Sequence, residues 1–222
     1  VNVYSIDPEN SRDLDDAFSI EQVNDDQYKM SIYIANVPIV LDCYDLWEHL
    51  THRISTIYLP EERRTMLPEI LSDNICSLLE DKERFAFTME VLYDGNTKEI
   101  LPNSISFYNS LICVKKNYVY EEKSLLKSRD YKQLYHITKQ LDANTQDSHD
   151  VISYWMIYMN TQSAKLLYDR KCGLFRKIQV YEKHIQHNID DKDIKQTVSM
   201  WNNISSGYVL YNENEIPTYP YI

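Results

Sequence analysis

A dense group of carboxylates near the start of the chain is the feature of the sequence that most directly indicates chemistry. The ten residues of segment 7–16 carry five acidic side chains, which are Asp7, Glu9, Asp13, Asp15 and Asp16. Like charges at this density repel one another and raise each other's pKa unless a cation compensates them. Aspartate is short, and its oxygens suit hard divalent ions such as Mg²⁺. The segment therefore predicts a site for one or two metal ions of the kind that hydrolyses phosphodiesters.

The spacing of these aspartates is compatible with convergence on one ion. Asp13 and Asp15 point the same way from an extended backbone, because side chains alternate along it. The polar loop after Asp7 can fold that residue back toward them. From spacing alone, a solvated acidic loop stays an open alternative. A calcium loop of the EF-hand type is not supported, because its glycine and glutamate positions are taken by Arg12 and Phe18.

Composition limits the class of protein. The chain has 222 residues and 43% hydrophobic residues, which is enough for one sizeable domain or two small ones. Its formal net charge is −11, so a diffuse electrostatic grip on nucleic acid is disfavoured unless the basic residues are clustered. The four cysteines contain no Cys-x-x-Cys pair, which predicts reduced, buried residues rather than a zinc or redox site. Neither a signal peptide nor an apolar span is visible, and a cytoplasmic location is expected.

The pattern of apolar residues predicts strands first and helices later. Period-two alternation and turn residues predict strands over 17–23, 28–35 and 84–93, followed by one or two returning strands over 100–118. Helical spacing predicts helices over 41–54, 127–141, 150–170 and 190–201. The tail over 213–222 is expected to be irregular. The predicted fold class is α+β (mixed α/β), with a strand-rich N-terminal half and a helix-rich C-terminal half.

The acidic segment resembles the opening motif of the RNB catalytic domain of the ribonuclease II and ribonuclease R family, which includes the exosome's catalytic nuclease subunit. The resemblance rests on Ile6-Asp7-Pro8 and on Arg12-Asp13-Leu14-Asp15-Asp16-Ala17. Further family segments follow in order at 34–37, 53–60, 66–72 and 75–78, and Arg84 opens the next strand. Agreement is close over 6–93 and looser over 105–177. The whole chain, 1–222, is therefore expected to be a partial RNB domain.

The resemblance implies an activity and a cofactor. RNB enzymes degrade single-stranded RNA hydrolytically from the 3′ end and release nucleoside 5′-monophosphates, with Mg²⁺, for which Mn²⁺ can stand in. The implied catalytic and metal-binding residues are Asp7, Asp13, Asp15 and Asp16, and Asp15 is expected to be indispensable. The resemblance also implies a role in RNA degradation and partners in the full-length protein, namely flanking RNA-binding domains of the cold-shock and S1 types.

The resemblance and the positions of basic side chains also indicate where RNA is held. Tyr58 matches a tyrosine that packs on the terminal nucleotide, and a phenol ring is a stacking platform. Its neighbours form a basic patch, which consists of His52, Arg53, Arg63 and Arg64. Arg12 is a further expected RNA contact. A second basic patch lies on and just after the last long helix, and it consists of Lys165, Arg170, Lys171, Arg176 and Lys177.

The sequence departs from the family pattern at several places. Asn36 stands where the family usually has aspartate, and Ser153-Tyr154 stands where it often has two glutamates, one of which contacts ribose. The segment over 141–150 is much shorter than its counterpart, and the chain stops before the arginine-bearing C-terminal motif. Two alternatives therefore stay open. One is a catalytically weak or inactive RNB homologue that binds RNA or acts as a scaffold, and the other is an acidic interaction module.

Overall fold

The computed structural model describes residues 1–49, 56–59, 61–180 and 204–212. They form two compact units, the first over residues 1–155 and the second within residues 156–222. Among the described residues, no helix is long and apolar enough to cross a membrane.

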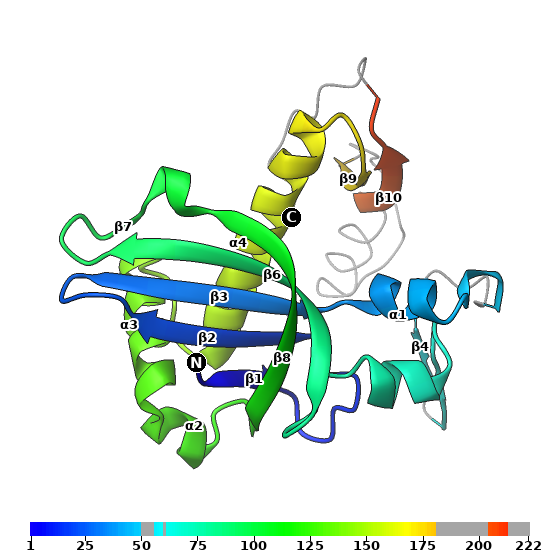
Figure 1. Cartoon of the computed structure of the whole chain (residues 1–222), viewed down its shortest axis with the longest axis horizontal. Coiled ribbons are helices and arrows are strands. Elements are labelled where there is room, and N and C mark those ends of the chain that lie inside the picture. Colours follow the sequence, from blue (N-terminus) through cyan, green and yellow to red (C-terminus); the bar gives the residue numbers. More distant parts are fainter. Residues whose placement is uncertain (50–55, 60, 181–203, 213–222) are drawn as a thin grey trace, which may run out of the picture. The chain divides into compact units, whose positions relative to one another are not determined.

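The first unit is built on a closed, five-stranded barrel (Figure 1). Its strands are β1 (Val3–Asp7), β2 (Asp16–Gln22), β3 (Gln27–Ala35), β6 (Glu83–Asp94) and β8 (Ser106–Val119). Hydrogen bonding runs in the order β3-β2-β1-β8-β6, and β3 also pairs with β6, which closes the ring. β1 and β8 are parallel, and the other barrel pairs are antiparallel. The short β7 (Glu99–Ile100) pairs with the end of β6.

Small and apolar side chains on one face of the strands allow the barrel to close tightly. Ala17 and Ala86 are fully buried in one core cluster with Tyr33. The Ser19 hydroxyl of β2 and the Tyr33 hydroxyl of β3 lie 2.9 Å apart and form a buried hydrogen bond. Four consecutive residues are buried in β1 and four in β2, so both faces of these two strands are covered at those positions.

Helices follow the barrel strands along the chain. These are α2 (Lys123–Lys127), α3 (Arg129–Leu141) and α4 (Ser148–Asp169), the last of which begins in the first unit and ends in the second. α3 packs against β2. The Trp155 indole is fully buried and donates to Thr138 Oγ1 of α3 at 2.9 Å. In the second unit, β9 (Leu174–Val180) and β10 (Ile204–Leu210) form an antiparallel pair.

The connection between β3 and β6 contains several short elements. They are α1 (Val37–Cys43), η1 (Trp47–His49), β4 (Ile57–Tyr58), β5 (Arg63–Arg64) and η2 (Leu71–Ile75), and a further 3₁₀ turn, η3 (Pro102–Ser104), precedes β8. Figure 1 shows α1 and β4 at the end of the barrel where β1 ends and β2 begins. This connection therefore lies beside the loop that carries the aspartates.

The predicted fold class is confirmed, and most predicted strands and helices are found within a few residues of their expected bounds. The helix predicted over 41–54 is wrong over its described part, 41–49, because Asn36 caps a helix that starts at Val37. That helix ends at Cys43, and the chain then turns through Asp45, whose φ is +53°. Residues 50–54 lie outside the described part of the chain. β9 and β10 were not predicted from the sequence. The predicted helix over 190–201 and the tail over 213–222 lie outside the described residues.

The four cysteines were predicted to be reduced and buried, and only the first part of this prediction holds for all of them. All four cysteines are free. Cys76 is buried, but Cys43 and Cys172 are exposed and Cys113 is half-buried, so the expectation of burial is wrong for three of them. Cys43 and Cys172 each lie where a helix has just ended or is ending, at the surface of the fold.

Candidate active site

The loop between β1 and β2 carries Asp13 and Asp15 and is flanked by Asp7 and Asp16 at the two strand ends; we call this segment, residues 7–16, the aspartate loop. A buried leucine fastens it to the core of the first unit. Leu14 is 5% exposed, and its N–H donates to Ser77 Oγ at 3.0 Å. The N–H of Leu78 donates to the Leu14 carbonyl at 2.9 Å. Because Leu14 turns inward, its neighbours Asp13 and Asp15 remain on the outer side, half-buried and exposed respectively.

Asp7 and Asp16 lie where β1 ends and β2 begins, so the barrel fixes their backbones. Asp7 stands opposite Val119 in the parallel pair, and Asp16 stands opposite Ile34. The Ser5 hydroxyl donates to Asp7 Oδ2 at 2.6 Å. Asp16 Oδ2 is buried and has no hydrogen-bond partner among the described residues. A buried carboxylate oxygen without a partner is costly unless a proton or a cation compensates it.

The electrostatics of three of these aspartates favour a cation. Burial raises the pKa of Asp7 to about 6; the Ser5 hydrogen bond opposes this rise, and the charges of Asp15 and Asp13 add to it. Burial, with the charges of Asp7 and Asp15, raises the pKa of Asp16 to about 7. Displacement of water by the surrounding chain, with the charge of Asp13, raises the pKa of Asp15. A bound divalent ion would relieve this mutual repulsion.

Asp13 differs from the other three because it already has a cationic partner. Arg63 Nη1 donates to Asp13 Oδ1 at 3.0 Å, and Arg63 Nη2 pairs with Asp73 Oδ2. Arg64 likewise pairs with Glu62 at 2.6 Å. The basic patch expected beside the stacking tyrosine is therefore not free where it is described, because both arginines are paired with carboxylates.

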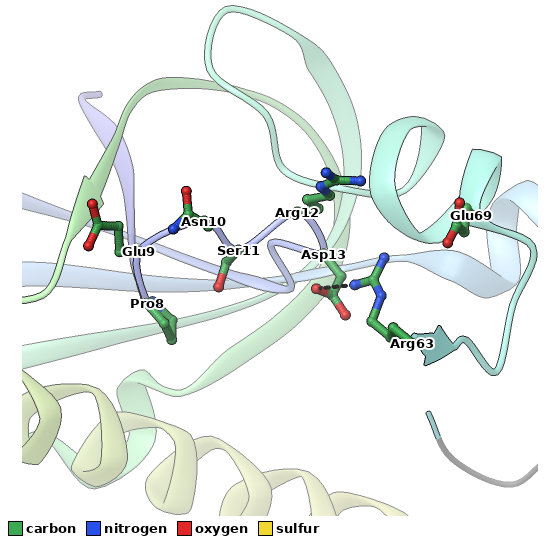
Figure 2. Close-up of a pocket in the computed structure, with 8 residues that line it drawn as sticks. All are labelled: Pro8, Glu9, Asn10, Ser11, Arg12, Asp13, Arg63 and Glu69. Atoms are coloured by element: carbon green, nitrogen blue, oxygen red, sulfur yellow. Dashed lines mark hydrogen bonds and ion pairs between the residues drawn. The ribbon is translucent and has the colours of Figure 1, made fainter. Parts of the chain in front are cut away.

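A pocket of about 540 Å³ opens beside the aspartate loop. Figure 2 shows the Asp13–Arg63 ion pair at this pocket, with the Arg12 guanidinium directed away from the pair. Arg12 is exposed, which leaves its charge available to an anion. The lining residues are Pro8, Glu9, Asn10, Ser11, Arg12, Asp13, Arg63 and Glu69.

The aspartates fit a metal ion, although they do not form a preassembled cage. Within the described part of the chain, no group of three or more histidine, cysteine, aspartate or glutamate side chains surrounds a common metal position. Mg²⁺ usually keeps several water ligands and is held by one or two carboxylates together with substrate phosphates. The buried, unpartnered oxygen of Asp16 and the raised pKa values of Asp7 and Asp16 match that mode of binding.

The expected RNA contacts lie in separate parts of the chain. Tyr58 belongs to β4 and pairs with Arg63 across the hairpin, but its side chain and the whole of Arg53 lie outside what the structure describes. Arg176 is exposed in β9, opposite Tyr208, and belongs to the second unit.

Tyr120, which was not predicted from the sequence, lies at the aspartates. The N–H of Tyr120 donates to the Asp7 carbonyl at 3.2 Å. Burial and the charges of Asp16 and Asp7 raise the pKa of Tyr120 to about 12. The Tyr120 ring stacks on His149 with centroids 3.7 Å apart. Nothing in the sequence distinguishes Tyr120 from the other 18 tyrosines, so this contact was not predictable from the pattern.

The departures from the family pattern have definite places in the structure. Asn36 accepts from the Ile39 N–H at 3.4 Å and donates to Asn109 Oδ1 at 2.9 Å, so it serves as a helix cap and a bridge to β8. Ser153 is exposed on α4. The Tyr154 ring packs edge-on against Trp155 with centroids 5.2 Å apart.

Comparison with known proteins identifies the family. The RNB domain model matches residues 1–145, and these matched residues fall within the first unit. The chain therefore belongs to the RNB domain family. Ribonuclease R of Aquifex aeolicus is 35% identical over 122 residues, which cover 54% of this chain and 17% of the relative. The chain thus corresponds to a small part of such an enzyme.

Solved structures share the fold. The structure of an active-site mutant of the Dss1 exoribonuclease from Candida glabrata matches with a TM-score of 0.69 and 16% identity, over 94% of this chain and 35% of that one. Yeast Ssd1, described as a pseudonuclease, matches with a TM-score of 0.68 and 13% identity, over 96% of this chain and 34% of that one. Since a nuclease and a pseudonuclease match equally well, the fold alone does not decide whether the site is active.

Proposed function

We propose that this chain is part of the catalytic domain of a Mg²⁺-dependent exoribonuclease. It would degrade single-stranded RNA from the 3′ end by hydrolysis and release nucleoside 5′-monophosphates. The observation that carries the proposal is the buried, unpartnered Asp16 Oδ2 beside the interacting charges of Asp7 and Asp15. Membership of the RNB family and the names of its relatives, ribonuclease R and an exoribonuclease, support the same activity.

The proposed metal ligands are Asp7, Asp13, Asp15 and Asp16, with Mg²⁺ or Mn²⁺ as the ion. When bound, such an ion neutralises phosphate charge and lowers the pKa of a coordinated water. In this chain, Asp7 and Asp16 present carboxylates at fixed strand ends. The exposed Asp15 lies on the outer side of the loop, where it can orient the attacking water, and we assign it the indispensable role.

The proposed RNA contacts are Tyr58, Arg53, Arg12 and Arg176. Arg12 is the best supported of them, because its exposed guanidinium lies at the pocket next to the aspartates. In the full-length protein, flanking domains of the cold-shock or S1 type would share the binding of RNA. This sharing would offset the formal charge of −11 on this chain, which opposes RNA binding.

The second candidate is a catalytically weak or inactive RNB homologue that binds RNA or serves as a scaffold. One observation favours it: Arg63 pairs with Asp13 Oδ1, so one of the four expected metal ligands is already engaged by a cationic side chain. The fold is compatible with this candidate as well, since the pseudonuclease Ssd1 shares it. Four intact aspartates favour the enzyme.

A labelled-RNA assay separates these candidates. The full-length parent is incubated with 5′-labelled single-stranded RNA, with Mg²⁺ or with EDTA, beside an Asp15→Asn variant. The enzyme predicts a ladder of products shortened from the 3′ end, which both EDTA and the substitution abolish. RNA binding without shortening in any condition would favour the scaffold. Absence of both shortening and salt-dependent RNA binding would favour the acidic interaction module.

A further inference from the structure

We propose that Arg63 is a positioning residue that clamps the β4–β5 hairpin to the aspartate loop, and so places the proposed 3′-end contact relative to the carboxylates. The part of this inference that concerns catalysis, the placing of a 3′-end contact, rests on the proposed function. The clamp itself is a structural claim that can be tested without nuclease activity.

The clamp has two arms that reach different segments. One guanidinium nitrogen donates to Asp13 Oδ1 in the β1–β2 loop at 3.0 Å, and the other pairs with Asp73 in η2. All three side chains are largely shielded, with exposed fractions of 20% for Arg63, 29% for Asp13 and 14% for Asp73. The Ser72 hydroxyl donates to Asp73 Oδ1 at 2.6 Å and so fixes the second arm. Three segments, 50 and 10 residues apart in sequence, therefore meet at one guanidinium.

The hairpin needs such an anchor because it is too small to hold its own position. β4 and β5 have two residues each, and among the described strands they pair only with each other. The Leu59 N–H donates to the Glu62 carbonyl at 2.9 Å and closes the turn. Isolated hairpins of this size are marginal in water, so side-chain contacts must fix the place of this one. An arginine fork is suited to the task, because its planar donors hold two carboxylates at once.

The register connects the clamp to the proposed RNA contact. Arg63 is the cross-strand partner of Tyr58, so a shift of Arg63 moves the Tyr58 backbone with it. The other end of the clamp, Asp13, uses only Oδ1 for Arg63, and Oδ2 has no hydrogen-bond partner among the described residues. Asp13 can thus hold the hairpin with one oxygen while the other stays available to the aspartate group.

Amide hydrogen exchange of the full chain tests the clamp directly. Arg63→Met should speed exchange in a peptide spanning 56–64 by about tenfold or more, because the hairpin then opens locally. Arg63→Lys should give an intermediate rate, since one ammonium replaces the two-armed fork. Arg64→Met is the matched control: it removes the same charge one residue away, and its partner is the exposed Glu62. Its exchange should stay within about twofold of wild type.

A second variant, Asp73→Asn, removes the other charge of the clamp and distinguishes local opening of the hairpin from a general folding defect. It lies outside the aspartate loop and should speed exchange in the hairpin while the barrel strands keep their protection. Unchanged hairpin exchange in both Arg63→Met and Asp73→Asn would overturn the clamp, and so would an equal effect of Arg64→Met.

The catalytic meaning of the clamp is tested separately on the full-length parent. Arg63→Met and Asp73→Asn should raise KM for single-stranded RNA about tenfold, the scale of effect seen for residues that support a binding group. In Asp73→Asn, which replaces a residue paired with Arg63 rather than with a proposed metal ligand, the Mg²⁺ concentration for half-maximal rate should stay within about twofold of wild type. In Arg63→Met that concentration should also change, because the proposed ligand Asp13 loses its partner. A raised Mg²⁺ requirement with unchanged KM in Asp73→Asn would overturn the positioning role. If wild-type protein has no nuclease activity, the proposed function fails, while the exchange result still decides the clamp.

Discussion

The two sides of the aspartate loop contrast sharply, although they carry the same residue type. On the barrel side, Asp7 and Asp16 stand at strand ends, partly out of water, and their pKa values are raised to about 6 and about 7. On the outer side, Asp13 is held by Arg63 at 3.0 Å. Among the described residues, a cationic side chain therefore pairs with an aspartate on the outer side but not on the barrel side.

The contrast teaches that an acidic motif is not a uniform set of ligands. The position of each carboxylate on the barrel sets how far it is removed from water. Arg63, which is far from Asp13 in sequence but contacts it in space, compensates the charge of that residue alone among the four aspartates described. Mutations on the two sides should therefore act in opposite directions on the stability of the metal-free protein. The largest expected effect, however, is on catalysis and concerns Asp15, the second aspartate on the outer side.

Asp15→Asn should lower the rate of RNA hydrolysis by about a thousandfold or more, because it removes a charge at the reacting phosphate while keeping the shape of the side chain. RNA affinity should change little. Single-turnover hydrolysis and equilibrium RNA binding by the full-length parent measure the two quantities. Asp142→Asn serves as the control, because it removes an acidic charge at the end of α3, outside the aspartate loop. Loss of RNA binding equal to the loss of rate would contradict the assignment.

The stability of the metal-free protein should fall as pH rises from about 4 to about 7. The folded state holds protons on Asp7 and Asp16 that the unfolded chain, with pKa values near 3.8, has already lost. The folded state therefore binds more protons than the unfolded state in this pH window. As a result, the free energy of unfolding decreases as pH rises, by about 2 to 4 kcal/mol from these two groups. Denaturant titrations in EDTA measure it.

Other groups also titrate, so the comparison is with an Asp7→Asn, Asp16→Asn double variant. The difference between wild type and this variant isolates the two carboxyls. If the two proteins show parallel pH profiles, the carboxyls are not perturbed as described.

Asp16→Asn should stabilise the metal-free protein at pH 8 by about 1 to 3 kcal/mol, because it removes a buried charge that repels Asp7 and Asp15. With excess Mg²⁺ the advantage should shrink or reverse, since wild type gains binding energy that the variant loses. Thermal or urea unfolding with EDTA and with Mg²⁺ measures both. A destabilised variant in EDTA would show that the Asp16 charge is compensated within the fold.

Asp13→Asn should have the opposite sign and a smaller size. It breaks one arm of the Arg63 ion pair and should destabilise the metal-free protein by about 1 kcal/mol, as expected for a partly exposed pair. High salt should reduce the difference from wild type. Urea unfolding at low and high salt tests this prediction, and a stabilised variant would remove the contrast between the two sides.

The local elements and the acidic motif were predictable from the sequence, while their long-range partners were not. Alternation and the turn at Asn24 mark β2 and β3, because the side-chain period of a strand is written in the chain itself. Closure of the barrel depends on β3 pairing with β6 and β1 pairing with β8, which no local pattern encodes. The Asp13–Arg63 ion pair joins residues 50 positions apart, so it was not predictable from the local sequence either. Arg63 was expected to belong to a basic patch beside Tyr58, but it is paired with Asp13 and Asp73.

The extent of the domain stays a prediction. The sequence resemblance reaches to about residue 177, whereas the family model matches residues 1–145. β9 and β10 were not predictable because each is short and has a weak strand pattern: β9 follows Gly173 and carries two adjacent basic residues, and β10 contains Gly207. The assignment of the second unit to the same domain therefore depends on the weaker part of the resemblance.

Binding of Mn²⁺ to the chain itself tests the central claim most directly, because Mn²⁺ replaces Mg²⁺ at such oxygen sites and its electron paramagnetic resonance signal changes on binding. The account predicts saturable binding of one or two ions at pH 8, weakened by lower pH, and lost in the Asp7→Asn, Asp16→Asn double variant but retained when Asp142 is replaced by asparagine. Saturable binding that the double variant keeps, or no binding by wild type with and without single-stranded RNA, would contradict it.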